Sequence, residues 1–110
     1  MADVTPSPLR ATIGETAPKI VDLTEQVLFG DVWERPELVK RDRSLVTIAS
    51  LVTGGNFVQL ESHVRMGLAN GLTEEEIVEV ATHLAFYAGW PKALSAIDVA
   101  QRVFAEDASA

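Results

Sequence analysis

Apolar residues recur at intervals of three and four along most of this chain, which is the spacing of helices that bury one side. The pattern is strongest over residues 45–52, 57–68 and 77–88, and it continues less regularly over 17–28 and 91–104. The first stretch is rich in β-branched residues, which also suit a strand, but its apolar stripe has the helical period. The pattern therefore predicts an all-α domain of about five to six helices with short connections.

Glycine, proline and capping residues predict where these helices begin and end. Thr73 and Glu76 have the spacing of a capping box, in which each side chain bonds the backbone N–H of the other residue at a helix start. Pro36 is predicted to lie in the first turn of a short helix, because its missing N–H costs nothing there. Breaks between helices are predicted at Gly54-Gly55, Asn70-Gly71 and Gly89-Trp90-Pro91.

The two ends of the chain show no steady period. We expect residues 1–14 to form a flexible arm, residues 15–105 the helical domain, and residues 106–110 a frayed polar tail. Apolar residues make up 47% of the 110 residues, which is high for a domain with so small a core. Part of this apolar surface is therefore expected to serve contacts between subunits.

Charge and residue usage exclude several classes of protein. Sixteen acidic and nine basic residues give a net charge of -7, so neither nucleic acid nor a membrane is an expected partner. No apolar run is long enough to cross a bilayer, and the first residues lack the apolar core of a signal peptide, so a cytoplasmic location is expected. The absence of cysteine excludes disulfides, thiolate nucleophiles and thiolate metal sites.

Two histidines are the first candidates for catalysis, because histidine is the side chain that ordinarily titrates near neutral pH. Glu79, His83 and Tyr87 are four residues apart, so they share one face of a predicted helix, and this face is expected to be half-buried. The plainer interpretation is an interface histidine beside a surface glutamate. His63 lies at the edge of another apolar stripe, where Gly67 is expected to leave space. Its plainer interpretation is a partly buried histidine bonded to a carbonyl.

Two arginines before the first strong helix are candidates for binding an anion. Arg41 and Arg43 stand at a predicted helix start, where backbone N–H groups and the helix dipole also attract negative charge. Arg43 is expected to lie nearer the core and to bind a carboxylate, whereas Arg41 is interpreted as a solvated charge beside Asp42 as N-cap. The sequence has neither a compact metal-binding signature nor a glycine-rich nucleotide loop, so no metal site and no cofactor are expected.

The segments that carry a family resemblance are RDRSLVTIA from residue 41, His63, NGLTEEEIVE from residue 70, and HLAFYAGWPKA from residue 83. Together they span residues 41–104 and resemble the carboxymuconolactone decarboxylase family. One branch of that family is similar to the alkylhydroperoxidase AhpD and has a Cys-x-x-Cys pair ahead of a histidine. If His63 is that histidine, Asn56 and Gln59 stand at the cysteine positions, so a thiol peroxidase is not expected.

The HLAFYAGWP segment favours the other branch, the 4-carboxymuconolactone decarboxylases of aromatic compound catabolism. This resemblance implies an AhpD-like fold, a homo-oligomer (trimer or hexamer), and a decarboxylase (a lyase) acting on a small carboxylated lactone or enolisable acid. The reaction would pass through a dienolate-like intermediate and need no cofactor. The implied catalytic residues are His63 and His83, which suit the oxyanion and proton steps, and Glu79, which sets the state of His83. The implied substrate-binding residues are Arg43, Arg41, Phe86, Tyr87 and Trp90.

Two other interpretations stay open. An isomerase or another proton-transfer enzyme on a related ring compound needs the same acid–base groups without loss of a carboxylate, and substrate profiling would separate the two. A non-catalytic oligomeric binding protein of the same fold would use the two histidines and Glu79 for packing alone. Alanine variants of these residues would then differ only in stability.

Overall fold

The described residues fold into helices that are joined by short connections. A computed structural model describes the backbone of residues 7–109 and the side chains of residues 7–106, and no strand occurs in that range. The predicted all-α fold is therefore confirmed. The elements are α1 (Pro8–Ile13), α2 (Pro18–Asp22), the π-helix η1 (Leu23–Leu28), the 3₁₀ helix η2 (Val32–Glu34), α3 (Lys40–Gly54), α4 (Phe57–Ala69), α5 (Glu74–Ala88) and α6 (Trp90–Ser109).

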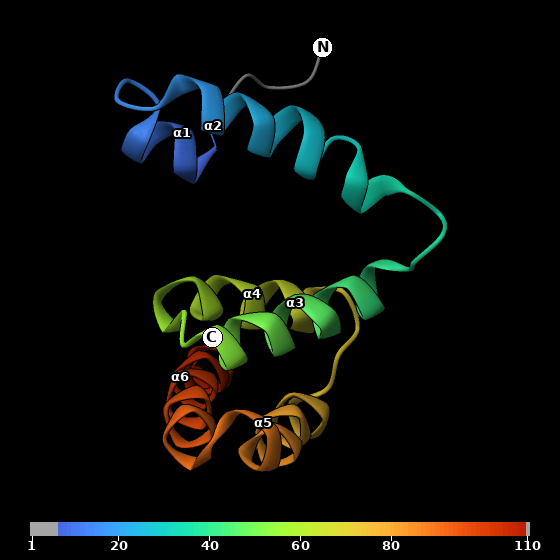
Figure 1. The fold of residues 1–110 in the computed structure, drawn as a ribbon, viewed down its shortest axis with the longest axis vertical. Helices are drawn as coiled ribbons and strands as arrows, with labels where there is room; N and C mark the ends of the chain where they lie inside the picture. Colours follow the sequence, from blue (N-terminus) through green and yellow to red (C-terminus); the bar gives the residue numbers. More distant parts are fainter. Residues whose placement is uncertain (1–6, 110) are drawn as a thin grey trace. The chain divides into compact units, whose positions relative to one another are not determined.

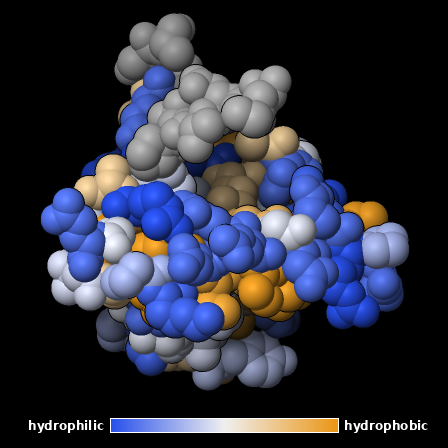
Figure 2. Space-filling model, turned by 90° about the horizontal axis from the view of Figure 1, so that it is seen from above, coloured by the Kyte–Doolittle hydropathy of each residue, from blue (hydrophilic) through white to orange (hydrophobic). Residues whose placement is uncertain are grey.

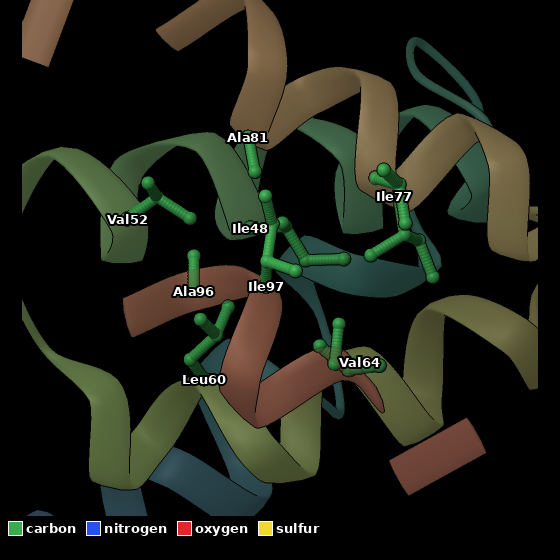
Figure 3. Close-up of a pocket in the computed structure, with 10 residues that line it drawn as sticks. Ile48, Val52, Leu60, Val64, Ile77, Ala81, Ala96 and Ile97 are labelled. Carbon is green, nitrogen blue, oxygen red and sulfur yellow. The ribbon is translucent and has the colours of Figure 1, made fainter. Parts of the chain in front are cut away.

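Helices α3 to α6 form the larger of two compact units, and the smaller unit, which ends at Glu37, contains α1, α2, η1 and η2. Helix α3 packs against α4 and α5, and α6 packs against the same two helices (Figure 1). The core between them consists of aliphatic and alanine side chains from all four helices, which point toward one another in Figure 3. A cavity among these side chains has a volume of about 10 Å³, which is room for one water molecule. The core therefore fixes the spacing of the helices but does not admit a substrate.

The helices of this unit end where the sequence predicts. Gly55 closes α3 with a φ of 69°, a left-handed conformation that glycine adopts without strain. Glu76 donates its backbone N–H to Thr73 Oγ1 at 3.1 Å, and the Thr73 N–H donates to Glu76 Oε1 at 2.9 Å. These two bonds confirm the capping box. The corner between α5 and α6 at Gly89 is also confirmed.

The short helix before α3 ends ahead of Pro36, whereas the sequence predicts that Pro36 lies in its first turn. The 3₁₀ helix η2 ends at Glu34, and Arg35 is extended with a ψ of 137°. The proline ring pushes the preceding residue out of the helical region, so the helix ends ahead of Pro36 and does not begin at it. The prediction for Pro36 is therefore wrong.

Ion pairs hold the first helix of the smaller unit. Arg10 on α1 donates to Asp22 at 2.6 Å and to Glu25 at 2.9 Å. Ser7 Oγ donates to Glu25 at 2.6 Å and accepts a bond from the Arg10 N–H, which caps α1. These contacts fasten α1 to α2 and η1, and they lower the pKa of Glu25 from its ordinary value, chiefly through Arg10.

The structure places helices inside both predicted end segments. Helix α1 occupies part of the predicted arm, and α6 continues to Ser109 through the predicted tail. Residues 1–6 and 110 lie outside the described residues. The division into an arm, a domain over residues 15–105 and a tail stays a prediction.

Large apolar residues remain exposed on the smaller unit although they have helical spacing. Those at 40% exposure or more are Ile20, Leu23, Val27 and Leu28, whereas Val21 is fully buried. Hydrophobic patches between hydrophilic residues are visible on the face in Figure 2. Within the described range, no helix combines the length and the apolar character needed to cross a membrane.

Candidate active site

An open groove lies between α3 and α5. Its lining residues are Leu45 and Ala49 of α3 and Glu76, Glu79, Val80, His83 and Leu84 of α5. Leu45 and Ala49 are four residues apart, as are Glu79 and His83, so each helix presents one face to the groove. The apolar lining residues are half-buried, whereas Glu79 and His83 are exposed. An apolar lining with a few polar groups is the usual composition of a site for a small molecule.

Glu79, His83 and Tyr87 follow one face of α5, as their spacing predicts. The rings of His83 and Tyr87 have centroids 5.0 Å apart and are inclined by 30°. The predicted half-burial is wrong, because all three side chains are exposed in the described chain. The residues of α5 that enter the core lie on another face, and they are Ile77, Ala81 and Ala85.

Arg41 is connected to the groove through Glu76. Its Nη2 donates to the Glu76 carboxylate, which lines the groove, and its Nη1 donates to Asp42 Oδ1 at 3.1 Å. The backbone N–H of Thr73 and the nearby Arg41 guanidinium together hold the pKa of Glu76 below its ordinary value. The sequence identified Glu76 as a capping residue but not as a groove residue. Its contact with Arg41 joins positions 35 apart in the chain, which no local pattern reveals.

Arg43 occupies a different position from the one expected. Its Nε donates to the backbone oxygen of Leu38 at 2.9 Å, and it is not among the residues that line the groove. Helix α3 begins with Val39 as its N-cap, so Asp42 lies in the first turn and the prediction of Asp42 as N-cap is wrong. Arg41, interpreted from the sequence as a solvated charge, is thus the arginine bonded to a groove residue.

His63 lies on α4 and is not among the groove residues. It is half-buried with a buried Nδ1, and this burial lowers its pKa from the ordinary value. The space predicted at Gly67 is filled, because a β-carbon there would lie 3.0 Å from Leu72 and 3.1 Å from Ile48. The described chain therefore does not bring His63 into the groove that His83 lines.

Phe86 and Trp90 pack against each other at the corner between α5 and α6. Their ring centroids are 5.2 Å apart in an edge-to-face arrangement. Phe86 is 76% exposed and Trp90 54%, and neither lines the groove. Phe86 and Trp90, which are predicted to bind the substrate, therefore lie on the outside of the described chain. Phe86 follows His83 on α5, and Trp90 begins α6.

The groove lining carries two carboxylates and one imidazole. The positive charge of Arg41 faces the negative charges of Glu76 and Asp42. Among the described side chains, no group of three or more histidine, aspartate or glutamate residues is arranged to hold a metal ion. His83 is thus the imidazole of the groove lining, and Arg41 is bonded to the lining through Glu76.

This helical chain belongs to a known class of protein. Residues 18–102 match the carboxymuconolactone decarboxylase family, and the chain belongs to that family, as the sequence motifs implied. A 4-carboxymuconolactone decarboxylase of Acinetobacter baylyi is 42% identical over 76 residues, which are 69% of this chain and 57% of the relative.

Two further relatives extend the likeness. The nitrosuccinic acid decarboxylase npaB of Metarhizium robertsii is 36% identical over 81 residues, which are 74% of this chain and 57% of the relative. An uncharacterized 15.0 kDa protein in the nqo9-nqo10 intergenic region of Paracoccus denitrificans is 33% identical over 84 residues, 74% of this chain and 63% of the relative. The matched regions thus span 57% to 63% of the length of these three relatives.

Proposed function

We propose that this protein is a decarboxylase, a carboxy-lyase without a cofactor, that acts on a small carboxylic acid in the groove between α3 and α5. The observation that carries the proposal is the presence of Glu79 and His83 together on that groove, in a chain of this family. Two of its relatives are named as decarboxylases, which supports the same reaction type.

The substrates in those two names share one chemical property. In 4-carboxymuconolactone, a carboxylate sits beside the C=C bond that is conjugated with the lactone carbonyl, and in nitrosuccinic acid one sits on the carbon that bears the nitro group. Loss of CO₂ then leaves an electron pair that spreads onto carbonyl or nitro oxygens. We propose a substrate of this class, an acid that carries its own electron acceptor, and this property removes the need for a cofactor.

The groove residues suit the steps of such a reaction. The C–C bond to the carboxylate breaks, CO₂ leaves, and the electron pair stays on the substrate as a dienolate or a nitronate. His83 donates a proton to carbon and regains one from water, while Glu79, four residues away, orients the imidazole. The apolar side chains of Leu45, Val80 and Leu84 reduce the contact of the reacting carboxylate with water, which favours its departure as neutral CO₂.

We also propose that the protein works as a homo-oligomer, a trimer or a hexamer. Large exposed residues gather at the corner between α5 and α6, namely Phe86, Tyr87, Trp90 and Leu94. An exposed apolar cluster of this kind is typical of an interaction surface. A second copy placed over this corner would remove Phe86 and Trp90 from water close to His83, and so give both residues a part in binding the substrate.

Release of CO₂ from each of the two named substrates, measured with the full chain, tests the proposal. We expect turnover with at least one of them, and a loss of about tenfold or more in Glu79→Gln, because the imidazole loses its orienting carboxylate. Glu75→Gln is the matched control, since it makes the same charge change on α5 at an exposed position outside the groove. No release from a folded, assembled protein with either substrate would contradict the proposal.

The same assay in deuterium oxide distinguishes the alternatives. Deuterium that enters recovered substrate without release of CO₂ would contradict decarboxylation and indicate an isomerase or another proton-transfer enzyme. An intact oligomer that binds these acids and catalyses neither reaction would indicate a binding protein.

A further inference from the structure

The first turns of α3 and α5 meet at the contact between Arg41 and Glu76. Arg41 follows Lys40, the first residue of α3, and Glu76 stands in the first turn of α5. The unpaired backbone N–H groups of a first turn give each helix start a partial positive charge. The full charge of Arg41 adds to that of the two helix starts, and the same first turns carry the carboxylates of Asp42 on α3 and of Glu74, Glu75 and Glu76 on α5.

The carboxylates that Arg41 contacts here belong to the protein itself. Glu76 accepts a bond from Nη2 and Asp42 accepts one from Nη1. The Arg41, Asp42 and Glu76 side chains are 38%, 44% and 39% exposed, so a small ligand can reach all three. Glu76 has a second anchor, because its other oxygen accepts the Thr73 N–H at 2.9 Å. Glu76 can therefore release Arg41 and still cap α5.

We propose that Arg41 binds a carboxylate of the substrate, and that Glu76 occupies this guanidinium until the incoming carboxylate displaces it. The ligand class is a small dicarboxylate, and the carboxylate that pairs with Arg41 is the one that does not leave as CO₂. Displacement is feasible because the exposed pair of Arg41 and Glu76 contributes little net stability, so a ligand carboxylate loses little by breaking it. Glu76 then determines specificity, since a ligand without a carboxylate cannot compete for Arg41. This inference rests on the proposed function for the location of the site, but not on turnover.

Succinate is a suitable probe, because it is a dicarboxylate without a lactone or a nitro group and so binds without reacting. Titration of succinate into the nitrogen-15-labelled full chain, followed through the backbone amide signals of the first turns of α3 and α5, gives the Kd and the location. We expect Glu76→Gln to bind succinate about two- to fivefold more tightly, because the competing ion pair is lost while glutamine still caps the helix. We expect Arg41→Gln to weaken binding about tenfold.

Two matched variants make the outcome specific. Glu75→Gln removes the same charge from the same turn of α5, and we expect the Kd to stay at the wild-type value. Equal tightening in Glu75→Gln and Glu76→Gln would mean a general charge effect and would overturn the proposal. A loss of binding in Arg43→Gln rather than in Arg41→Gln would also overturn it. Because the titration needs no turnover, a failure to release CO₂ would count against the proposed decarboxylase alone.

Discussion

The two histidines of this chain lie in different surroundings, although both stand beside an apolar stripe at helical spacing. His63 on α4 is half-buried, with its Nδ1 out of reach of water, one turn after the buried Leu60. His83 on α5 is exposed, lines the groove and lies against the ring of Tyr87. Helices α3 and α6 pack against α4, whereas the face of α5 that carries His83 remains open.

This difference shows that burial distinguishes the two histidines, although their positions beside an apolar stripe are alike in the sequence. An imidazole in apolar surroundings resists protonation, because its charged form loses hydration, and such a residue suits a structural role. An exposed imidazole on a groove exchanges protons with both water and a ligand. Within one chain, His83 is therefore the proposed proton donor, and His63 lies outside the groove.

The largest expected effect is on turnover in His83→Gln. We expect the rate of CO₂ release to fall by about 10²- to 10⁴-fold, which is the usual contribution of a positioned acid or base. His63→Gln should retain most of the activity, because that residue does not line the groove. Measurement of kcat on protein of unchanged oligomeric state makes this comparison.

The distinction between His83 as the proton donor and His63 as a residue outside the groove would be wrong if both variants, folded and assembled, lost the same activity. That result would place His63 at a site completed by a second copy. Thermal melting of each variant separates such a catalytic loss from unfolding, because a catalytic role leaves the melting temperature near its wild-type value.

The next effect in size is on stability, and it contrasts the leucines near the two histidines. Leu60 is 1% exposed in the core, whereas Leu84 is half-buried at the groove. We expect Leu60→Ala to lower the free energy of unfolding by about 2–5 kcal/mol, because it leaves a cavity that the surrounding helices cannot close. Leu84→Ala should cost about 1–2 kcal/mol, since less apolar area leaves water there on folding. Urea denaturation measures both, and equal costs would show that the groove is packed as tightly as the core.

Much of the fold could be predicted from the sequence because its signals are local. The capping box of Thr73 and Glu76 and the left-handed end of α3 at Gly55 depend on residues within one or two turns. The contact between Arg41 and Glu76 and the filled space at Gly67 depend on how separate helices pack. No periodicity within one helix reports that packing.

For the candidate site, too, the sequence predicts what lies within one helix but not how the helices pack. The shared face of Glu79 and His83 follows from their spacing on one helix. Their exposure, and the choice of Arg41 over Arg43 beside the groove, depend on which side of α3 meets α5. A sequence pattern identifies the face of each helix but not the element that covers it.

The smallest expected effect is the pH dependence that His63 gives to stability. Its pKa in the folded chain lies below the ordinary value of 6.5, because burial disfavours the charged imidazole. Below pH 6.5 the unfolded chain therefore binds more protons at this residue than the folded chain does. Its contribution to stability is complete above pH 6.5 and is lost as the pH falls toward the folded pKa.

His63→Gln should remove this part of the pH dependence. Urea denaturation at intervals between about pH 7.5 and pH 5.5 should give a shallower loss of stability for His63→Gln than for the wild type. Glu25, Glu76 and Glu106, whose pKa values are lowered from 4.5, add their own loss at lower pH, so this window separates the histidine from them. Ser62→Ala, at an exposed position next to His63, controls for changes in α4 that involve no proton. Parallel curves for wild type and His63→Gln would show that protonation of His63 costs the folded chain nothing, and the contrast between the two histidines would then rest on the groove alone.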